Sequence, residues 1–113
     1  MNRIELLGRL TNDVEIKKGK ESEYARFSLA VQRKTSKEKV DFIDCVAFGK
    51  LAEVIQKYCK KGQRIIVCGS LQIDSYENKE GKNVKATNVI VNDFYFTEFN
   101  KDLAKEGTNE NPF

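Results

Sequence analysis

Histidine and tryptophan are absent from this 113-residue chain, proline occurs once and cysteine three times. The lack of histidine removes the commonest metal ligand and the commonest general base, which argues against most metal sites and catalytic triads. The cysteines, Cys45, Cys59 and Cys68, form no Cys-x-x-Cys pair, and an odd number cannot all be paired in disulfides. We therefore expect small buried thiols in a reducing compartment, with no metal and no cofactor.

Long hydrophobic runs are also missing. No apolar stretch approaches the roughly 20 residues that a membrane-spanning helix needs, and the first residues lack a signal-peptide cleavage pattern. Hydrophobic residues make up 40% of the chain and charged residues 33%, values typical of one soluble globular domain. The net charge of +3 fits a protein that binds a polyanion, but a typical soluble protein can carry the same charge. We expect a cytoplasmic protein that does not bind membranes.

The chain does contain an unusual strand pattern at residues 41–48, Asp-Phe-Ile-Asp-Cys-Val-Ala-Phe. Because side chains alternate along a strand, Phe42, Asp44, Val46 and Phe48 share one face, and the opposite face is also apolar. Two interpretations are open. The strand is either buried on both faces, or it is buried on one face and presents two aromatic rings to an extended ligand.

Alternating segments and one helical segment follow each other along the chain. Their order is three strands, one short helix and two long strands, with a projecting hairpin between the last two. This order predicts a mainly β fold, the five-stranded Greek-key barrel of the oligonucleotide-binding type (OB-fold), with the helix between strands 3 and 4. An antiparallel sandwich is the competing architecture. Gly8 and Gly69 interrupt strands where a small barrel would bend. The expected strands are residues 3–10, 24–34, 41–48, 64–73 and 86–99, the helix is 51–58, the hairpin is 75–85, and residues 11–23 form a connection.

Residues 1–99 form the expected OB-fold domain, and residues 100–113 form a separate tail. The tail is nearly all polar and ends in Pro112-Phe113. Such a segment cannot bury enough apolar surface to order itself. We expect it to be flexible.

Five groups of residues carry a resemblance that runs in order from residue 2 to about residue 96. They are Asn2-Arg3 with Leu7-Gly8-Arg9-Leu10-Thr11, Phe27-Ser28-Leu29-Ala30-Val31, Asp41-Phe42-Ile43 with Val46-Ala47-Phe48-Gly49-Lys50-Leu51-Ala52-Glu53, Tyr58 with Lys60-Lys61-Gly62, and Gly69-x-Leu71 with Ser75-Tyr76. In these motifs the chain resembles the bacterial single-stranded DNA-binding protein family. The resemblance implies an OB-fold that assembles into a homotetramer and wraps single-stranded DNA during DNA replication, recombination and repair.

The resemblance also implies which residues contact DNA. Phe42, Phe48 and Tyr76 match positions where aromatic rings stack on bases, which contributes about 1–3 kcal/mol per base whatever the sequence. The alternative for each ring is a packing role, in the core or at the base of the hairpin. Basic residues are candidates for phosphate contacts, with a solvated surface charge as the alternative for each. They are Lys50 and Lys61, which match basic positions of the family, and Arg3, Arg9, Arg33, Lys34 and Lys82, which would flank the groove.

Two features depart from the family pattern. Gln32-Arg33-Lys34 stands where many members have a further aromatic residue, so one stacking site is expected to be missing or replaced by an arginine. The tail is short and weakly acidic, but Pro112-Phe113 matches the tip that docks replication and repair proteins, where a terminal carboxylate and a ring would enter a basic-rimmed pocket. The alternative is a frayed end that happens to finish in phenylalanine. A compact chain of this kind would suit a phage or mobile-element member, at the nucleoid or at phage replication sites.

Three other functions compete with this one. An enzyme is disfavoured because Asp41 and Asp44 lie three residues apart on a strand, face opposite sides and cannot form a carboxylate pair. An RNA-binding or primosome-type OB protein would use the same stacking, although the Pro-Phe tip argues against it. A protein-only adaptor would use the aromatic face as a protein interface. We predict no catalytic residues.

Overall fold

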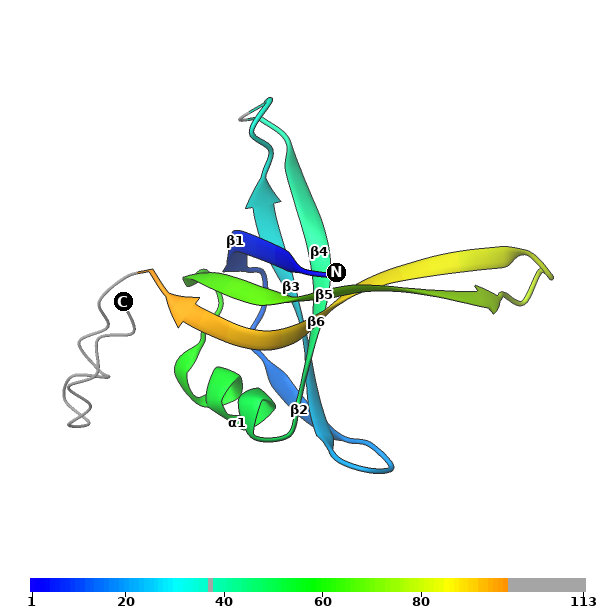
Figure 1. Ribbon diagram of the computed structural model, residues 1–113, viewed down its shortest axis with the longest axis horizontal. Helices are drawn as coiled ribbons and strands as arrows, with labels where there is room; N and C mark the ends of the chain where they lie inside the picture. The colour runs from blue at the N-terminus through cyan, green and yellow to red at the C-terminus, as the bar shows by residue number, and fades with distance from the viewer. Residues whose placement is uncertain (37, 98–113) are drawn as a thin grey trace.

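The computed structural model describes residues 1–36 and 38–97, which form a small barrel with two projecting hairpins (Figure 1). The elements follow the order that the sequence predicts, with one additional strand. They are β1 (Ile4–Leu10), β2 (Glu15–Lys18), β3 (Glu23–Gln32), β4 (Val40–Phe48), α1 (Gly49–Tyr58), β5 (Arg64–Glu77) and β6 (Asn83–Phe96).

The sheet closes on itself. The strands follow the order β1-β5-β6-β4-β3-β2, and β1 also pairs with β3 through Arg9↔Ala30 and Leu10↔Leu29. Within this ring all pairings are antiparallel except the short contact between β4 and β6. A closed ring of β1, β3, β4, β6 and β5, with a helix between its third and fourth strands in chain order, is the predicted OB-fold. The competing sandwich, which consists of two separate sheets, is wrong.

The hydrophobic core fills the barrel and extends to helix α1. On β3, Ala25 and Phe27 are buried while Arg26 between them is exposed, as the alternating pattern predicts. Helix α1 places Ala52 and Ile55 against the same core cluster. Burial of a large aliphatic side chain contributes about 1.5–3 kcal/mol, so this cluster provides the main driving force for folding. Its largest fully buried members are Leu10, Leu29, Ile55, Ile65, Val67 and Val89.

Strand β2 was not predicted, because residues 11–23 were expected to form a connection. Glu15–Lys18 is a short strand that pairs antiparallel with the start of β3. It contains one apolar residue, Ile16, so it is too short and too polar to give an alternating signal. Its turn is closed by the Gly19 amide, which donates to the Ser22 carbonyl at 2.9 Å.

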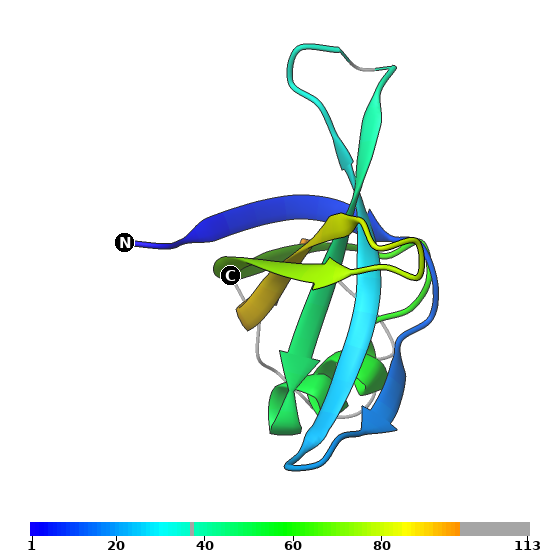
Figure 2. The same cartoon turned by 90° about the vertical axis from the view of Figure 1, so that its right-hand side faces the viewer.

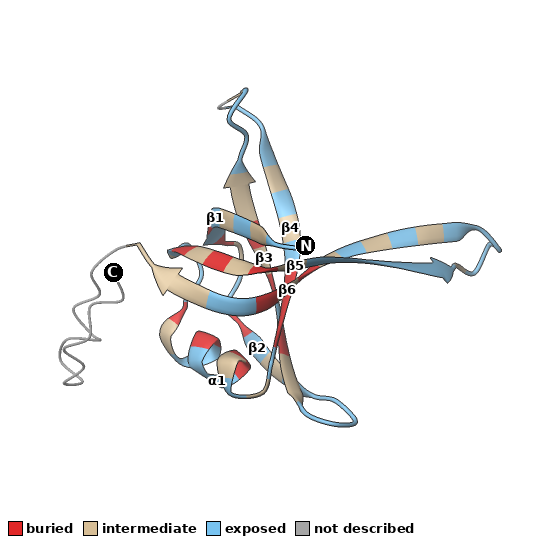
Figure 3. Ribbon diagram, in the orientation of Figure 1, coloured by how far each residue is buried: buried red, intermediate tan, exposed pale blue. Residues whose placement is uncertain are grey.

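The predicted hairpin at residues 75–85 exists, but it belongs to longer strands. The strands β5 and β6 continue outward from the barrel and stay paired as far as Glu77↔Asn83 (Figures 1 and 2). At the turn, Asn78 Oδ1 accepts hydrogen bonds from the Glu80 and Lys82 amides. The arms are largely exposed (Figure 3). Backbone hydrogen bonds thus extend both strands beyond the core. The sequence did not indicate this extension, because the outer parts of the strands lack a clear apolar pattern.

Gly8 and Gly69 differ in their roles. The ladder between β5 and β6 shifts register between Cys68 and Gly69, so the predicted bend at Gly69 is confirmed as a β-bulge. A Cβ on Gly69 would lie 2.0 Å from the Ile90 carbonyl oxygen. Gly8 pairs with Ile65 in regular register, and no bulge occurs there. It is needed because a Cβ would lie 2.7 Å from the Ala30 oxygen, where β1 passes from β5 to β3.

The cysteines are all free, but only two of them are buried as expected. Burial raises the pKa of the Cys45 and Cys59 thiols to about 12. Cys68 is half-buried on β5, so the expectation of a third buried thiol is wrong. It lies between the buried residues Val67 and Gly69, so the alternation of β5 turns its side chain to the outer face of the barrel.

Candidate nucleic-acid interface

The central strand β4 is buried on one face and carries exposed rings on the other. Cys45 and Ala47 point into the core, whereas the side chains of Phe42 and Phe48 are 70% and 50% exposed. The doubly buried interpretation is therefore wrong for both rings. Val46 lies between them on the outward face and is only 5% exposed. Neighbouring side chains therefore cover the strand between the two projecting aromatic rings.

A third ring, which the sequence interpretation missed, lies beside Phe48. Tyr24 on β3 is directly opposite Phe48 in the ladder, with their ring centroids 6.5 Å apart and their planes at 48°. Tyr24 precedes Arg26 and Ser28 by even steps, so the alternation of β3 places it on the same outward face as these two residues. What the sequence lacked was the register that brings it to Phe48. The pair forms a broader aromatic surface than one ring alone.

Tyr76 belongs to the same outward surface. Cys45 and Val89 are paired and both buried, so their neighbours Asp44 and Asn88 face outward. Asn88 is opposite Gln72 on β5, and Tyr76 lies four residues further along that strand, on the same face. Its side chain is 53% exposed. One continuous face of β3, β4, β6 and β5 thus carries all three predicted rings, together with Tyr24.

The predicted phosphate contacts fall into two groups. The lysines are exposed: Lys50 at the start of α1, Lys61 after the helix, and Lys34 and Lys82 near the hairpin tips. Lys61 uses its backbone amide to donate to Asp13 Oδ1 at 2.9 Å. None of these four ammonium groups is ion-paired with a described residue.

The three arginines already have protein partners. Arg3 forms an ion pair with Glu5 at 2.7 Å, and Arg33 binds Asp41 through two hydrogen bonds of 2.9 and 3.0 Å. The hydrogen bond from Arg33 lowers the pKa of the Asp41 carboxyl. Arg9 donates from Nη1 to the Gly62 carbonyl oxygen at 2.9 Å. The carboxylates offset the positive charges of Arg3 and Arg33, which the sequence interpretation did not anticipate.

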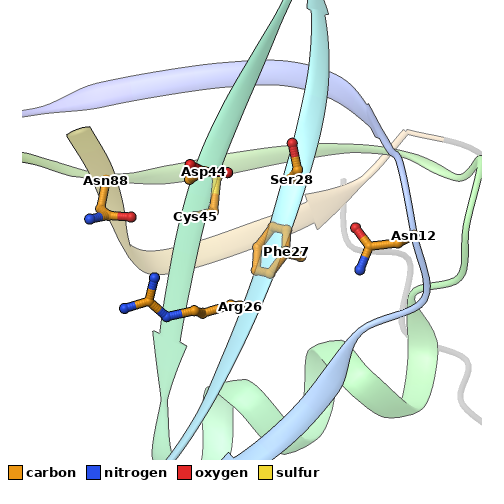
Figure 4. A pocket seen from close by; sticks show the side chains of 7 residues that line it. All are labelled: Asn12, Arg26, Phe27, Ser28, Asp44, Cys45 and Asn88. Atoms are coloured by element: carbon orange, nitrogen blue, oxygen red, sulfur yellow. The ribbon is translucent and has the colours of Figure 1, made fainter. Parts of the chain in front are cut away.

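A polar hollow of about 270 Å³ opens on this face, and Figure 4 shows the side chains that line it. Arg26 and Ser28 on β3, Asp44 on β4 and Asn88 on β6 line it. Phe27 and Cys45 also line it, although both are buried, so the floor of the hollow is the sheet itself. Arg26 is, after Tyr24, a second residue that the sequence interpretation did not assign to the site.

The remaining predictions concern the C-terminal tip, the two aspartates of β4, and metal or membrane binding. Pro112 and Phe113 lie outside the described residues. Asp41 is bound by Arg33, while Asp44 lies in the hollow on the other face, so the two carboxylates are separated as expected. Among residues 1–36 and 38–97, no group of three or more potential ligands could hold a metal ion, and no helix is long and apolar enough to span a membrane.

Comparison with known proteins gives consistent matches. The sequence model described as "Single-strand binding protein family" matches residues 1–97. A single-stranded DNA-binding protein of Clostridium perfringens is 43% identical over 98 residues, covering 85% of this chain and 65% of the relative. A single-stranded DNA-binding protein of Fusobacterium nucleatum is 44% identical over 117 aligned residues, which cover 97% of this chain and 73% of the relative. The chain thus spans about two thirds to three quarters of these relatives, and it belongs to the single-strand binding protein family.

Proposed function

We propose that this protein binds single-stranded DNA without sequence specificity and protects it during replication, recombination and repair. The observation that carries the proposal is the placement of Phe42, Phe48 and Tyr76 on one continuous exposed face. Every base has a π-face, so exposed rings along a surface bind a single strand whatever its sequence. In a duplex these faces are stacked on neighbouring pairs and are not available. We place this activity in the cytoplasm, at the nucleoid or at phage replication sites.

The proposal is tested by titration with oligo-dT, oligo-rU and duplex DNA, following tyrosine fluorescence because the chain lacks tryptophan. We expect tight, salt-sensitive binding to oligo-dT and much weaker binding to the other two. Equal binding to all three would indicate a generic basic surface. No binding to any of them would contradict the proposal and favour the protein adaptor, which would use the same face as a protein interface.

Lys50 is expected to contribute through charge rather than stacking. It is exposed at the start of α1, two residues after Phe48. Lys50→Ala should reduce the slope of log affinity against log salt by about 0.7, the value for one lost phosphate contact on a single strand. The matched control is Lys57→Ala at the other end of the same helix, which should leave the slope unchanged. An unchanged slope for both variants would remove Lys50 from the interface.

We further propose that the protein assembles into a homotetramer. In the described sheet, Ile4–Gly8 pairs with β5 on one side, whereas β3 pairs only with Arg9 and Leu10. The other edge of this segment therefore has free backbone groups, and the neighbouring Leu7 side chain is 49% exposed. Native mass spectrometry should give a mass about four times the 12.9 kDa of one chain. A monomer at micromolar concentration would contradict this assembly.

We also propose that Pro112 and Phe113 bind replication and repair proteins, in support of which their sequence resembles the docking tip of the family. Replacing both with alanine should leave the affinity for oligo-dT nearly unchanged, because no stacking ring of the barrel is altered. The same variant should lose capture of replication proteins from an extract. Capture equal to that of the unmodified protein would contradict this role.

A further inference from the structure

The polar hollow between the rings has an unusual charge arrangement. Arg26 provides a guanidinium with donors only, and Asp44 provides a carboxylate with acceptors only. Neither side chain forms an ion pair or a side-chain hydrogen bond with another described residue. This differs from Arg3 and Arg33, whose charges are satisfied by carboxylates nearby. The hollow therefore offers one donor group and one acceptor group, both free to bind a ligand.

The hollow lies on the path between two stacking positions. In the ladder, Ala30 is opposite Phe42, Ser28 is opposite Asp44, and Tyr24 is opposite Phe48. The two phenylalanines are six positions apart, which corresponds to roughly 20 Å along an extended strand. Successive nucleotides of one B-form DNA strand rise by only about 3.4 Å, so a strand that contacts both rings has further nucleotides between them. A DNA strand that follows β4 would place those nucleotides over the hollow, because Asp44 lies between the two phenylalanines.

The four bases present different edges to such a site. The amino group of guanine donates and its O6 and N7 accept, so guanine can bind a carboxylate and a guanidinium at once. The guanine ring N–H lies beside that amino group and donates in the same direction. Thymine instead has carbonyl oxygens on both sides of its only ring N–H, and these repel a carboxylate. Adenine and cytosine each have an amino donor and a ring-nitrogen acceptor, but neither has a ring N–H beside the amino group, so the carboxylate gains only one hydrogen bond from them.

We propose that this hollow is a base-edge subsite that prefers guanine, with Asp44 binding its amino and ring N–H groups and Arg26 binding O6 or N7. The subsite rests on the proposed binding of single-stranded DNA and adds a base preference to it. Stacking on Phe42, Phe48 and Tyr76 accepts every base, and it distinguishes bases only by stacking strength, for which the test below controls. The other polar residues of the hollow are Asn12, Ser28 and Asn88, whose side chains both donate and accept, so they add hydrogen bonds without selecting one base.

The test uses ten-nucleotide oligo-dT strands in which one central thymine is replaced by guanine, inosine or adenine. The unmodified protein should bind the guanine strand about fivefold or more tightly than the all-thymine strand. Inosine keeps the ring N–H and O6 but lacks the amino group, so its strand should fall between the two. Adenine controls for the stronger stacking of a purine. Its strand should bind less tightly than the guanine strand.

Asp44→Asn assigns the effect to the carboxylate. Asparagine keeps the shape of the side chain but replaces one acceptor oxygen with a donor, so the guanine and thymine strands should bind within about twofold of each other. The matched control is Asp74→Asn, an exposed acid on the same face of β5 outside the hollow, which should keep the full preference.

The outcomes separate the two proposals. Tight binding of all four strands with equal affinity would overturn the guanine subsite and leave the proposed function standing. A guanine preference that survives Asp44→Asn would also overturn the subsite, because stacking alone would then explain it. Failure to bind even the all-thymine strand would overturn both proposals.

Discussion

Replacing Phe42 with alanine is expected to weaken single-strand binding by about 1–3 kcal/mol, or roughly 5- to 150-fold in dissociation constant. The Phe42 side chain is 70% exposed and lies outside the buried core, so its removal costs little folding free energy. The loss should be similar for thymine, cytosine and adenine strands, because a ring stacks on any base. Titrations with the three homopolymers at one salt concentration measure it. Phe48→Ala should act in the same direction.

The matched control for Phe42→Ala is Ile73→Ala. Ile73 is also an exposed apolar side chain, 56% accessible, but it lies three residues from Tyr76 on β5 and so faces the opposite side of the strand. Its replacement should leave the affinity unchanged. If Phe42→Ala binds as tightly as the unmodified protein while its circular dichroism spectrum is intact, Phe42 does not stack on DNA.

Gly69→Ala is expected to cause the largest loss of stability. A Cβ at this position would lie 2.0 Å from the Ile90 carbonyl oxygen and 2.9 Å from its carbonyl carbon, so backbone atoms of β6 would have to move. Overpacking typically costs 1–3 kcal/mol, and a clash with backbone places this change at about 3 kcal/mol or above. The melting temperature should fall by more than about 10 °C. Thermal unfolding at fixed protein concentration measures the difference, since the proposed assembly would make the midpoint depend on concentration.

Two further variants grade this effect. Gly8→Ala should destabilise the protein less than Gly69→Ala. Its Cβ would lie 2.7 Å from the Ala30 carbonyl oxygen, whereas that of Gly69→Ala would lie 2.0 Å from the Ile90 carbonyl oxygen. Ser75→Ala, on the exposed arm of the same strand as Gly69, should change the free energy of unfolding by less than about 0.5 kcal/mol. A melting temperature for Gly69→Ala equal to that of Ser75→Ala would mean that the bulge tolerates a side chain.

The elements with a strong local pattern could be predicted from the sequence. The alternation of Phe27 and Leu29 with Arg26 marked β3, and the rings of Phe42 and Phe48 marked an unusual β4. The alternation of apolar and polar residues did not predict the strands that lie outside the core. The short strand β2 has one apolar residue, and the outer halves of β5 and β6 have no core to face, so backbone hydrogen bonds alone define them.

The finer features of the candidate site depend on register, which no local pattern contains. The Tyr24–Phe48 pair and the meeting of Ser28 with Asp44 arise only when β3 is aligned with β4. The same alignment brings Arg33 to Asp41. A slip of one residue in this ladder would send every side chain of one strand to the other face. Sequence reasoning could therefore name the exposed residues of each strand, but not which of them act together.

The way in which β1 joins the ring also determines when the barrel can form. Asn2 donates to the Leu71 carbonyl and accepts from its amide, although 69 residues separate them in the chain. During synthesis β1 leaves the ribosome first, but its partner β5 follows only after β2, β3, β4 and α1. Ring closure therefore requires a contact of high sequence separation, and such topologies fold in milliseconds to seconds rather than microseconds. Until β5 is available, β1 can pair only with β3, through Arg9 and Leu10, so we expect most of its apolar side to stay uncovered and the nascent chain to be prone to aggregate.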